Sequence, residues 1–554
     1  MEQLFSAETR RANLAALAGR PVDLLVIGGG ITGAGIARDA AMRGIGTALV
    51  DAGDFGHGTS SRSSRLIHGG LRYLEHGWLH LVFEASRERR TLLRIAPHLV
   101  KPRAFTFPVH QGSRVRRWEI SAAVWLYDLL AMFRNVHLHR LLSRRRVLEI
   151  EPQIRDQDLT GGALYYDAQC DDARLVLANV RSAHRHGALA ANYVRVTALE
   201  KAGGRVRGAT LEDVFTGERI AVRASVVVNA TGPWTDALRR LDEPGAAPLL
   251  RLTKGAHIAV PRARIGNAGA VTLTSPIDGR VMFVLPWGDV TMVGTTDTDT
   301  DCSPDDVAAD PDDITYLLRS ANAVFPNARL QTADVLAAWA GLRPLLADGG
   351  ASTASVPREH RIVESASGLL TIAGGKLTTY RSMAVELVNA VSKRLRHLDG
   401  RRVPSGAPTD REALPGGEVA DFAQLAEELV KEGQDGDVAD HLVATYGAEA
   451  AAVANLATRE PALALPLLDG WPLLRADVAY QARREMAMTV SDVLVRRTHL
   501  FHRHPTQAVE VAPLVGRLLA RELGWDAGRE AGSVAQYLAE VARMREAFTP
   551  AAST

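Results

Sequence analysis

Residues 22–51 read VDLLVIGGGITGAGIARDAAMRGIGTALVD, and this stretch decides the fold. The apolar run 22–27 is short and ends in glycines, which is typical of a buried strand in a parallel sheet. Residues 31–43 have helical spacing with small side chains, and residues 46–51 form the next apolar run. The order strand, helix, strand predicts a βαβ unit.

The turn of this unit carries a nucleotide-binding pattern. Gly28, Gly30 and Gly33 form GxGxxG between the first strand and the helix, where glycines permit a tight turn, backbone approach to a pyrophosphate and close packing. Asp51 follows the second strand and is placed to accept a hydrogen bond from a ribose hydroxyl. The alternative is a glycine turn with a solvated carboxylate, and the unit alone fits NAD as well as FAD.

Two later segments favour FAD. Residues 226–234 (VVVNATGPW) run from a strand into a turn of small residues. Residues 371–379 (TIAGGKLTT) end a strand in two glycines and begin a helix, whose amides can stabilise negative charge. A nicotinamide that leaves in each cycle does not need to be enclosed by three segments.

Size, charge and cysteine usage narrow the class of protein. A chain of 554 residues exceeds one ordinary core, and a formal net charge of +2 does not indicate nucleic acid as a partner. Cys170 and Cys302 stand far apart and outside any CxxC pattern, so neither a disulfide framework nor a zinc site is indicated and a reducing compartment fits. The longest apolar run, residues 122–133, is interrupted by Asp128, so we expect any membrane contact to be peripheral.

The predicted architecture is α/β with an α+β cap and a helical end. Residues 1–402 form the oxidoreductase region, with a discontinuous Rossmann-like FAD-binding domain and an antiparallel-sheet substrate cap mainly at 236–334. The Pro- and Gly-containing stretch 403–417 is a linker, and residues 418–554 form an all-helical domain. The FAD-binding domain is assigned to about 20–110, 150–235 and 335–400. Helices are predicted at about 79–93, 120–142 and 377–396.

Seven stretches in order resemble the FAD-dependent glycerol-3-phosphate dehydrogenases of the D-amino-acid-oxidase-like superfamily. Each stretch is weak alone, but the ordered set is specific, and the helical end resembles the C-terminal domain of that family. The stretches are GGGITGAGIARDAAMRG (28–44), GTSSRSSRLIHGGLRYLEHG (58–77), NATGPWTD (229–236), TKGAHIAV (253–260), LPWGDVTMVGTTDTD (285–299), WAGLRPL (339–345) and AGGKLTTYR (373–381).

The resemblance implies the reaction and the partners. It implies oxidation of sn-glycerol 3-phosphate to dihydroxyacetone phosphate by hydride transfer to FAD, with electrons passed to a membrane quinone. It also implies a cytoplasmic protein that associates peripherally with the inner face of the cell membrane, and a homodimer is possible. Asp51 stands where the wider superfamily commonly has Glu, and Thr32 where this family often has Asn.

The residues predicted to contact FAD come from the matched stretches. They are Gly28, Gly30, Ile31, Thr32, Gly33, Asp51, Thr59, Ser60, Ser61, Ser64, Ala230, Gly232, Trp234, Gly374, Gly375, Leu377 and Thr378. We predict noncovalent attachment, because the histidines and cysteines lie outside recognised flavin-attachment contexts.

The resemblance also implies a site for a phosphorylated alcohol. Arg72, Tyr73, Arg343 and Lys376 are candidate contacts of the phosphate, since guanidinium forks and an ammonium suit a dianion. Each alone is compatible with a surface charge. Substrate contacts are also predicted for His257 and Thr379, and weaker ones for Lys254, Thr378 and Arg381.

Two histidines are candidates for the base that removes the hydroxyl proton. His68 lies in LIHGG and His257 in KGAHIAV, and a neutral imidazole titrates near working pH. A histidine in an apolar strand is more often a core residue, which counts against His257. We therefore favour His68, with Arg343 and Lys376 as the other catalytic candidates.

Two further patterns concern metals and membranes. The acidic run from Asp297 to Asp306 fails the EF-hand pattern at Cys302 and Ala308, so we expect no metal there and interpret it as a solvated loop. The segment from Arg114 to Arg146 surrounds apolar and aromatic residues with arginines, a composition typical of a helix on anionic lipid. An ordinary basic face with a core-packing stripe is the alternative.

Other functions remain open at this stage. A glycerol-3-phosphate oxidase that uses oxygen, or an amine or amino-acid oxidase of the superfamily, would share the FAD segments. A protein in which FAD is structural and the basic face recruits a partner would show no flavin bleaching with any substrate.

Overall fold

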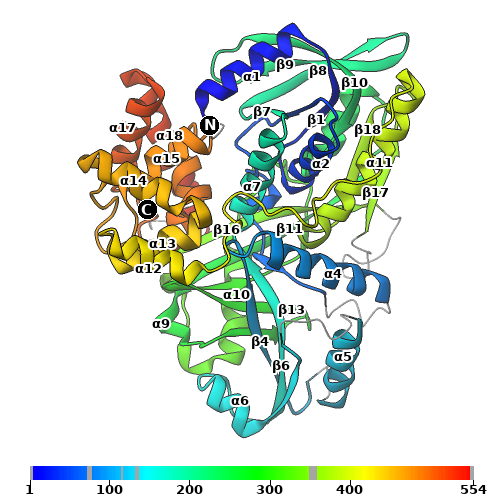
Figure 1. The fold of residues 1–554 in the computed structure, drawn as a ribbon. Coiled ribbons are helices and arrows are strands. Elements are labelled where there is room, and N and C mark those ends of the chain that lie inside the picture. Colours follow the sequence, from blue (N-terminus) through cyan, green and yellow to red (C-terminus); the bar gives the residue numbers. More distant parts are fainter. Residues whose placement is uncertain (1–3, 71–77, 114–116, 131–136, 348–358, 550–554) are drawn as a thin grey trace, which may run out of the picture.

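The computed structural model describes residues 4–70, 78–113, 117–130, 137–347 and 359–549. Within these ranges the chain forms two β-sheets, one above the other in Figure 1, and a helical region beside them. This arrangement confirms the predicted class of an α/β cofactor domain with a sheet-based cap and a helical C-terminal region.

The first sheet is built around the βαβ unit. Its strands lie in the order β17-β18-β10-β1-β2-β7, and β1 pairs in parallel with both β10 and β2. Strands β8 and β9 extend it through an antiparallel pairing of β9 with β10. The strands are β1 (Val22–Ile27), β2 (Thr47–Val50), β7 (Leu189–Ala191), β8 (Val194–Ala202), β9 (Arg205–Asp213), β10 (Arg219–Asn229), β17 (His360–Glu364) and β18 (Leu370–Gly374).

Both faces of β1 are buried, which explains why its sequence is a continuous apolar run. Leu24 and Val26 pack into a core shared with α2 (Ile31–Met42), α7 (Asp172–Arg185) and α11 (Tyr380–Asp399). Leu25 and Ile27 point to the other face, where α1 (Ala7–Gly19), β8 and β9 contribute. Successive side chains of a strand alternate between faces, so each face receives its own half of the run.

The second sheet is mostly antiparallel and draws on more of the chain than residues 236–334. Its order is β15-β11-β14-β13-β12-β4-β6-β3, with β16 paired to β11 and β5 to β6. Residues 100–110 and 159–170, assigned from sequence to the FAD-binding region, form β4 and β6 here, because their long antiparallel pairing joins them to this sheet. The strands are β3 (Leu66–Ile67), β4 (Val100–His110), β5 (Arg140–Ser143), β6 (Leu159–Cys170), β11 (Leu250–Pro261), β12 (Ala270–Thr274), β13 (Val281–Trp287), β14 (Val290–Gly294), β15 (Thr298–Asp299) and β16 (Ala337–Leu346).

Helices flank this sheet, and one predicted helix is wrong at its end. The helix predicted at 120–142 is α5 (Arg117–Leu130), and Arg140–Ser143 is instead β5, paired with β6. Pairing with β6 overrides the helical spacing of the sequence there. The other helices of this part are α4 (Leu79–Ile95), α6 (Arg144–Ile150), α9 (Arg262–Ile265) and α10 (Pro311–Val324), whereas α8 (Thr235–Asp242) packs against the first sheet.

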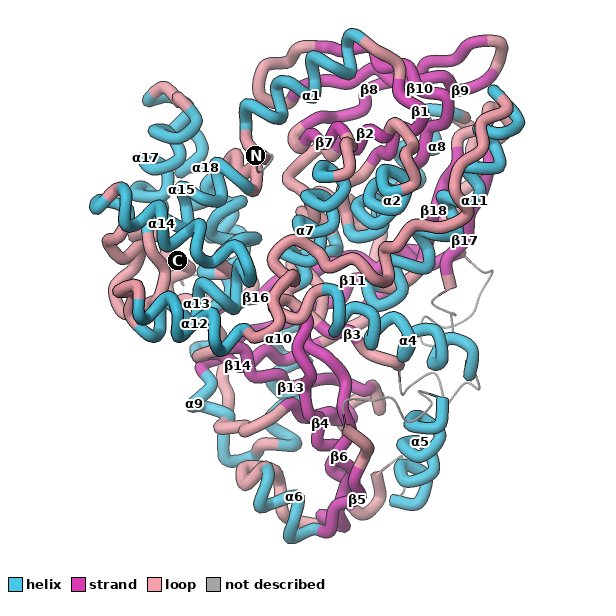
Figure 2. The backbone as a smooth tube through the Cα atoms, viewed as in Figure 1, coloured by secondary structure: helices cyan, strands magenta, loops and turns pink. Residues whose placement is uncertain are grey.

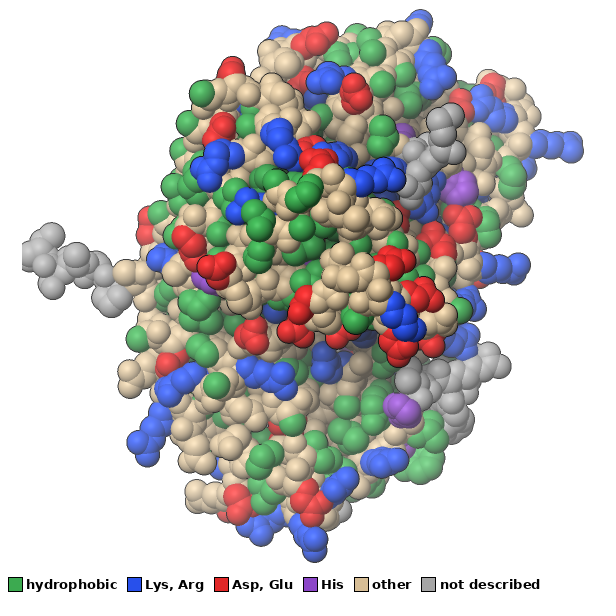
Figure 3. All heavy atoms as spheres, turned by 60° about the vertical axis from the view of Figure 1, so that its left-hand side comes forward, with side chains coloured by type: hydrophobic (Ala, Val, Ile, Leu, Met, Phe, Trp, Pro, Cys, Tyr) green, Lys and Arg blue, Asp and Glu red, His purple; other side chains and the backbone are tan. Residues whose placement is uncertain are grey.

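The C-terminal region is helical and packs against the second sheet (Figure 2). Its core includes Met292 and Trp339 from that sheet, so the helices and the cap share one apolar interior. The elements are α12 (Phe422–Lys431), α13 (Gly436–Tyr446), α14 (Ala450–Arg459), α15 (Arg475–Arg484), the π-helix η8 (Asp492–Arg497), α16 (Leu500–Arg503), α17 (Ala512–Leu523) and α18 (Ala527–Glu546). On the face in Figure 3, acidic and basic side chains are interspersed with apolar ones.

Candidate functional site

A cavity of about 1020 Å³ lies at the carboxyl ends of β1, β2, β10 and β18. Nucleotide cofactors bind at this edge of a parallel sheet, and the volume reaches the upper end of the range for small-molecule sites. Thirteen of the predicted cofactor residues line it: Gly28, Gly30, Ile31, Thr32, Asp51, Thr59, Ser60, Ala230, Gly232, Trp234, Gly374, Gly375 and Leu377.

Backbone crowding explains the glycines of the first turn. A Cβ on Gly33 would lie 1.8 Å from the carbonyl oxygen of Gly28. Gly28 itself has φ +105°, and a Cβ there would lie 2.6 Å from the carbonyl oxygen of Ala230. Only glycine fits both positions, so the helix begins directly against the strand end and its first amides face the cavity.

The N-terminus of α2 is linked to the next loop by a single serine. Its N-cap, Gly30, makes no side-chain capping bond, and the amide of Ile31 donates to Ser60 Oγ at 3.0 Å. Ser60 belongs to η1 (Thr59–Ser61), in which Thr59 Oγ1 donates to the carbonyl of Leu342 at 2.6 Å. Short polar side chains and open amides beside a helix N-terminus suit a diphosphate.

Asp51 is held at the cavity by backbone amides from the turn after β1 and from its own loop. Its carboxylate accepts from the amides of Gly29, at 2.6 Å, and Gly53, at 2.8 Å. His57 Nδ1 lies 3.0 Å from Asp51 Oδ1. Burial acts to lower the pKa of His57, but the charge and hydrogen bond of Asp51 outweigh it and raise the pKa above its usual value. The sequence analysis did not identify His57, which has no motif of its own.

The remaining predicted cofactor residues lie outside the lining of this cavity within the described chain. Gly33 acts through packing, and Ser61 lines a smaller adjoining cavity. Ser64 Oγ lies 2.9 Å from His257 Nε2. Thr378, in η5 (Leu377–Thr379), is bonded to the backbone of His68.

The turn of His68 is joined to the segment of Lys376. The His68 amide donates to Thr378 Oγ1 at 3.2 Å, and that hydroxyl donates back to the His68 carbonyl at 3.3 Å. Lys376 lines the cavity. Thr379, a predicted substrate contact, is buried instead, and its hydroxyl donates to Met383 Sδ at 3.9 Å. Arg72 and Tyr73 lie outside the described residues.

His257 is a core residue with a polar contact. It is 2% exposed, and its ring stacks on Trp339 with centroids 5.5 Å apart. Burial, with the nearby charges of Arg343 and Arg65, lowers the pKa of His257 to about 3. Its imidazole is therefore neutral at any working pH and is a weak proton acceptor.

Arg343, on β16, is bound by the segment between β14 and β15. Its guanidinium donates to Asp297 Oδ1 at 3.0 Å and to Thr295 Oγ1 at 2.9 Å, and it lies against Gly255, where a Cβ would approach it to 2.2 Å. Arg280 binds the other oxygen of Asp297 at 2.7 Å. The side chain of Asp297 is only 2% exposed, so the interpretation of its acidic run as a solvated loop is wrong for this side chain. Among the described residues, no cluster of acidic, histidine or cysteine side chains is placed to hold a metal ion.

A buried triad behind the His68 turn was missed by the sequence analysis. The amide of Gly69 donates to Tyr127 OH at 2.9 Å and to Asp167 Oδ1 at 3.1 Å. Tyr127 OH donates to Asp167 at 2.5 Å, and Arg89 NH1 donates to Tyr127 OH at 2.7 Å. Tyr127 lies on α5, so this helix is bonded directly to the turn. A tyrosine in an apolar helix has no signal that would reveal such a role.

The C-terminal region also reaches the cavity, which the sequence analysis did not anticipate. Thr489, Ser491 and Arg496 line it from the segment around η8, and Gln536, Ala539, Glu540 and Arg543 line it from α18. These residues follow helical periodicity and carry no binding motif.

Comparisons with known proteins match most of the chain. A family model described as FAD dependent oxidoreductase matches residues 23–381, and a model described as the C-terminal domain of alpha-glycerophosphate oxidase matches residues 407–530. The chain is 41% identical over 525 residues to the mitochondrial glycerol-3-phosphate dehydrogenase of Macaca fascicularis. The matched region covers 91% of this chain and 71% of that protein.

A bacterial relative and a solved structure show the same similarity. Identity is 39% over 525 residues to glycerol-3-phosphate dehydrogenase 2 of Mycobacterium tuberculosis, covering 94% of this chain and 88% of that one. The X-ray structure of the glycerol-3-phosphate dehydrogenase from Bacillus halodurans complexed with FAD matches with a TM-score of 0.82 and 32% identity, covering 99% of both chains.

Proposed function

We propose that this chain, which belongs to the FAD-dependent oxidoreductase family and within it to the glycerol-3-phosphate dehydrogenases, oxidises sn-glycerol 3-phosphate to dihydroxyacetone phosphate. The observation that carries the proposal is the cavity. Three glycine turns, at Gly28–Gly33, Ala230–Gly232 and Gly374–Gly375, converge there beside Lys376.

The residues of the cavity fit FAD. The open amides at the start of α2 and the hydroxyl groups of η1 would hold the diphosphate, and Asp51 would accept from the ribose. FAD, when bound, supplies the acceptor for the hydride that leaves C2 of the substrate.

Cationic side chains support a phosphorylated substrate. Lys376 lies at the cavity, and Arg343 is oriented by Asp297 of the segment between β14 and β15. Asp297 partly neutralises Arg343 but also fixes its direction, which lowers the entropic cost of binding an anion. We assign the phosphate to Lys376 and Arg343, with Arg72 and Tyr73 as further candidates.

We assign to His68 the role of the base that accepts the proton of the C2 hydroxyl. His68 is half-buried, and its backbone is bonded on both sides to Thr378. His257 is a weaker candidate because its pKa of about 3 makes it a poor acceptor. We assign to His257 the role of a neutral hydrogen-bonding partner of Ser64 at the wall of the site.

The test is anaerobic reduction of the bound flavin. Addition of glycerol 3-phosphate should bleach the flavin absorbance, and glycine or proline at the same concentration should not. Bleaching by an amino acid in place of glycerol 3-phosphate would show that the chain is an amino-acid oxidase. Flavin that is never bleached would show that the cofactor is structural.

For the electron acceptor we propose a membrane quinone, reached from a surface on α4 and α5. Trp118 is 66% exposed and Trp125 57% exposed on α5, and Leu79 and Phe83 are exposed on the neighbouring helix α4. The arginines Arg144, Arg145 and Arg146 are paired with Asp156 or Glu149, so the aromatic residues support lipid contact better than these arginines do. Within the described ranges, the helices lack the length and apolar character needed to cross a bilayer.

Two measurements test the acceptor and the surface. Reduced enzyme should be reoxidised faster by a soluble quinone than by air, and the reverse order would identify an oxidase. Cosedimentation with anionic vesicles should fall in a Trp118→Gln, Trp125→Gln variant. The matched control is Leu538→Gln, since Leu538 is 41% exposed on α18, in a different part of the molecule. Equal sedimentation of both variants would exclude α5 as the contact.

A further inference from the structure

The cofactor cavity has walls from both ends of the chain. Arg62 lies two residues beyond Ser60 in the N-terminal part, and Arg543 lies on α18 in the C-terminal part. Both side chains line the cavity, and both also line the smaller adjoining cavity with His57 and Glu540. The two arginines therefore meet at one place although 480 residues separate them in sequence.

Neither arginine is neutralised by a direct contact. Within the described part of the chain, the guanidinium groups of Arg62 and Arg543 make no hydrogen bond and no ion pair. Burial lowers the pKa of Arg62, Glu540 raises it, and the charges of Arg496 and Arg543 lower it further. Arg543 is thus close enough to repel Arg62, and Glu540 is shared because it also accepts from Ser491 Oγ at 2.9 Å.

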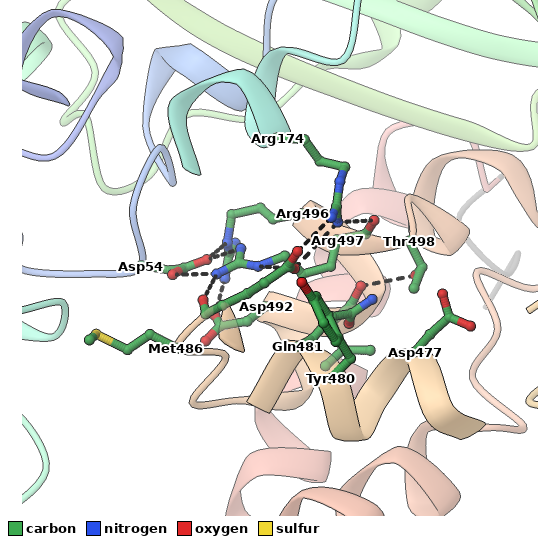
Figure 4. A network of polar contacts seen from close by, with 12 residues as sticks. Asp54, Arg174, Asp477, Tyr480, Gln481, Met486, Asp492, Arg496, Arg497 and Thr498 are labelled. Atoms are coloured by element: carbon green, nitrogen blue, oxygen red, sulfur yellow. Dashed lines mark hydrogen bonds and ion pairs between the residues drawn. The ribbon is translucent and has the colours of Figure 1, made fainter. Parts of the chain in front are cut away.

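A third arginine that lines the cavity, Arg496, already has ion-pair partners. Arg496 Nε donates to Asp54 Oδ2 at 2.7 Å and its NH2 group binds Asp492, while Arg497 donates to both oxygens of Asp54 at 2.7 and 3.1 Å. Figure 4 shows both guanidinium groups directed at Asp54. This junction fixes η8 to the loop that follows Asp51. Helix α18 is bonded in turn to the residues before η8, through Ser491 to Glu540 and Val490 to Ser533.

We propose that Arg62 and Arg543 together bind the diphosphate of FAD, so that the C-terminal region forms part of the cofactor site. The inference rests on the proposed function, since it assumes that the cavity holds FAD. Two guanidinium groups that line the same cavity as the N-terminus of α2 suit an anion, and the diphosphate is the anionic part of that cofactor. Arg543 is exposed at the mouth of the cavity, where a bound diphosphate would be its partner.

The test is retention of FAD by the full-length chain. Wild type, Arg543→Met, Arg543→Lys and Arg62→Met are diluted, and free flavin is separated from protein and measured by fluorescence. We expect Arg543→Met to bind FAD about 10-fold more weakly, because a charge-assisted hydrogen bond is lost, and Arg543→Lys to be intermediate. The difference should shrink at high salt, which screens an exposed charge.

Arg517→Met is the matched control. Arg517 is exposed on α17, and within the described residues it makes no hydrogen bond or ion pair. Its FAD affinity should equal that of wild type. If Arg543→Met does not fold, the FAD affinities of Arg543→Lys and Arg62→Met still test the proposal. Arg543→Lys keeps the positive charge, and Arg62→Met removes the charge of the other arginine.

The outcomes separate this inference from the proposed function. A wild-type chain that holds no FAD would refute the proposed function itself. A wild-type chain that holds FAD while Arg543→Met and Arg62→Met hold it equally well would overturn the present inference alone.

Discussion

The cofactor site and the junction with the C-terminal region are specified in opposite ways. At the cofactor turn, residues five positions apart form the site through their backbone, and a Cβ at Gly33 would meet the Gly28 carbonyl oxygen at 1.8 Å. At the junction, the side chain of Asp54 meets Arg496 and Arg497, which lie 442 and 443 residues away. Local backbone constraints are visible in a sequence, whereas distant side-chain pairs are not.

The largest effect is expected at the backbone turn. Gly33→Ala should abolish FAD binding and destabilise the fold by about 3 kcal/mol or more, because its Cβ has no room beside the Gly28 carbonyl. Flavin content and thermal unfolding measure both effects. Gly19→Ala is the control, since a Cβ at Gly19 meets nothing within 4 Å. Normal flavin content in Gly33→Ala would show that the turn can relax.

The junction is tested by Asp54→Asn. The substitution removes the carboxylate that Arg496 and Arg497 share, although Asp492 still binds Arg496, and should cost about 3–5 kcal/mol. Asp469→Asn, at an exposed position, should change the unfolding midpoint little. Equal midpoints for the two variants would mean that the junction contributes no net stability.

The contacts of Asp54 with Arg496 and Arg497 also predict how the stability of the fold depends on pH. Burial would raise the pKa of Asp54, but Arg497 and Arg496 outweigh it and lower the pKa to about 2. Because the folded value lies below the unfolded value of about 3.9, the contribution is complete above pH 4 and is lost as pH falls toward 2. Wild type should therefore lose stability over this range, and the difference from Asp54→Asn should narrow. A constant difference would contradict the assignment.

Arg343→Ala tests whether Arg343 binds the phosphate of the substrate. We expect catalytic efficiency toward glycerol 3-phosphate to fall by about 2–5 kcal/mol in transition-state binding, with flavin content unchanged. Arg280→Ala is the control, since Arg280 also binds Asp297. Equal losses in both variants would show that Arg343 acts through Asp297 and not on the phosphate.

His68→Ala tests whether His68 accepts the proton of the C2 hydroxyl. The rate of flavin bleaching should fall by roughly 100-fold, which is about 2.7 kcal/mol and the usual contribution of a positioned general base. FAD should remain bound. Stopped-flow bleaching across pH measures the rate and the ionisation that controls it. An unchanged rate and pH profile would remove His68 from the mechanism.

The smallest effect is expected at Tyr127. Tyr127→Phe removes the hydroxyl that bonds Gly69 and Asp167 and should cost about 1–3 kcal/mol of stability. Tyr316→Phe removes an exposed hydrogen bond to Asp278 and should change stability by less. Thermal unfolding compares the two variants. Equal decreases in the unfolding midpoint would mean that the buried hydrogen bonds of Tyr127 contribute no more stability than an exposed one.

The sequence predicted most of what depends on adjacent residues. Strand 22–27 lies where the apolar run placed it, and α2 ends within one residue of the predicted helix. Glycines and apolar runs encode these elements because backbone sterics and burial act locally.

Elements that depend on distant partners escaped prediction. The strand at Arg140–Ser143 exists because β6 offers it a pairing edge, and its leucines read as helix in isolation. Asp54, Tyr127 and Arg543 acquire their surroundings only when the chain folds, because each meets residues from another element.

The shared cavity has a consequence for the order of synthesis. A ribosome makes residue 28 more than 500 positions before residue 543, yet both line one cavity. The N-terminal turn can fold as soon as it leaves the ribosome, but the lining is complete only after α18 has been made. Loading of the cofactor into its finished site therefore follows the synthesis of α18, and a chain interrupted before α18 carries the glycine turns without the C-terminal residues that line the same cavity.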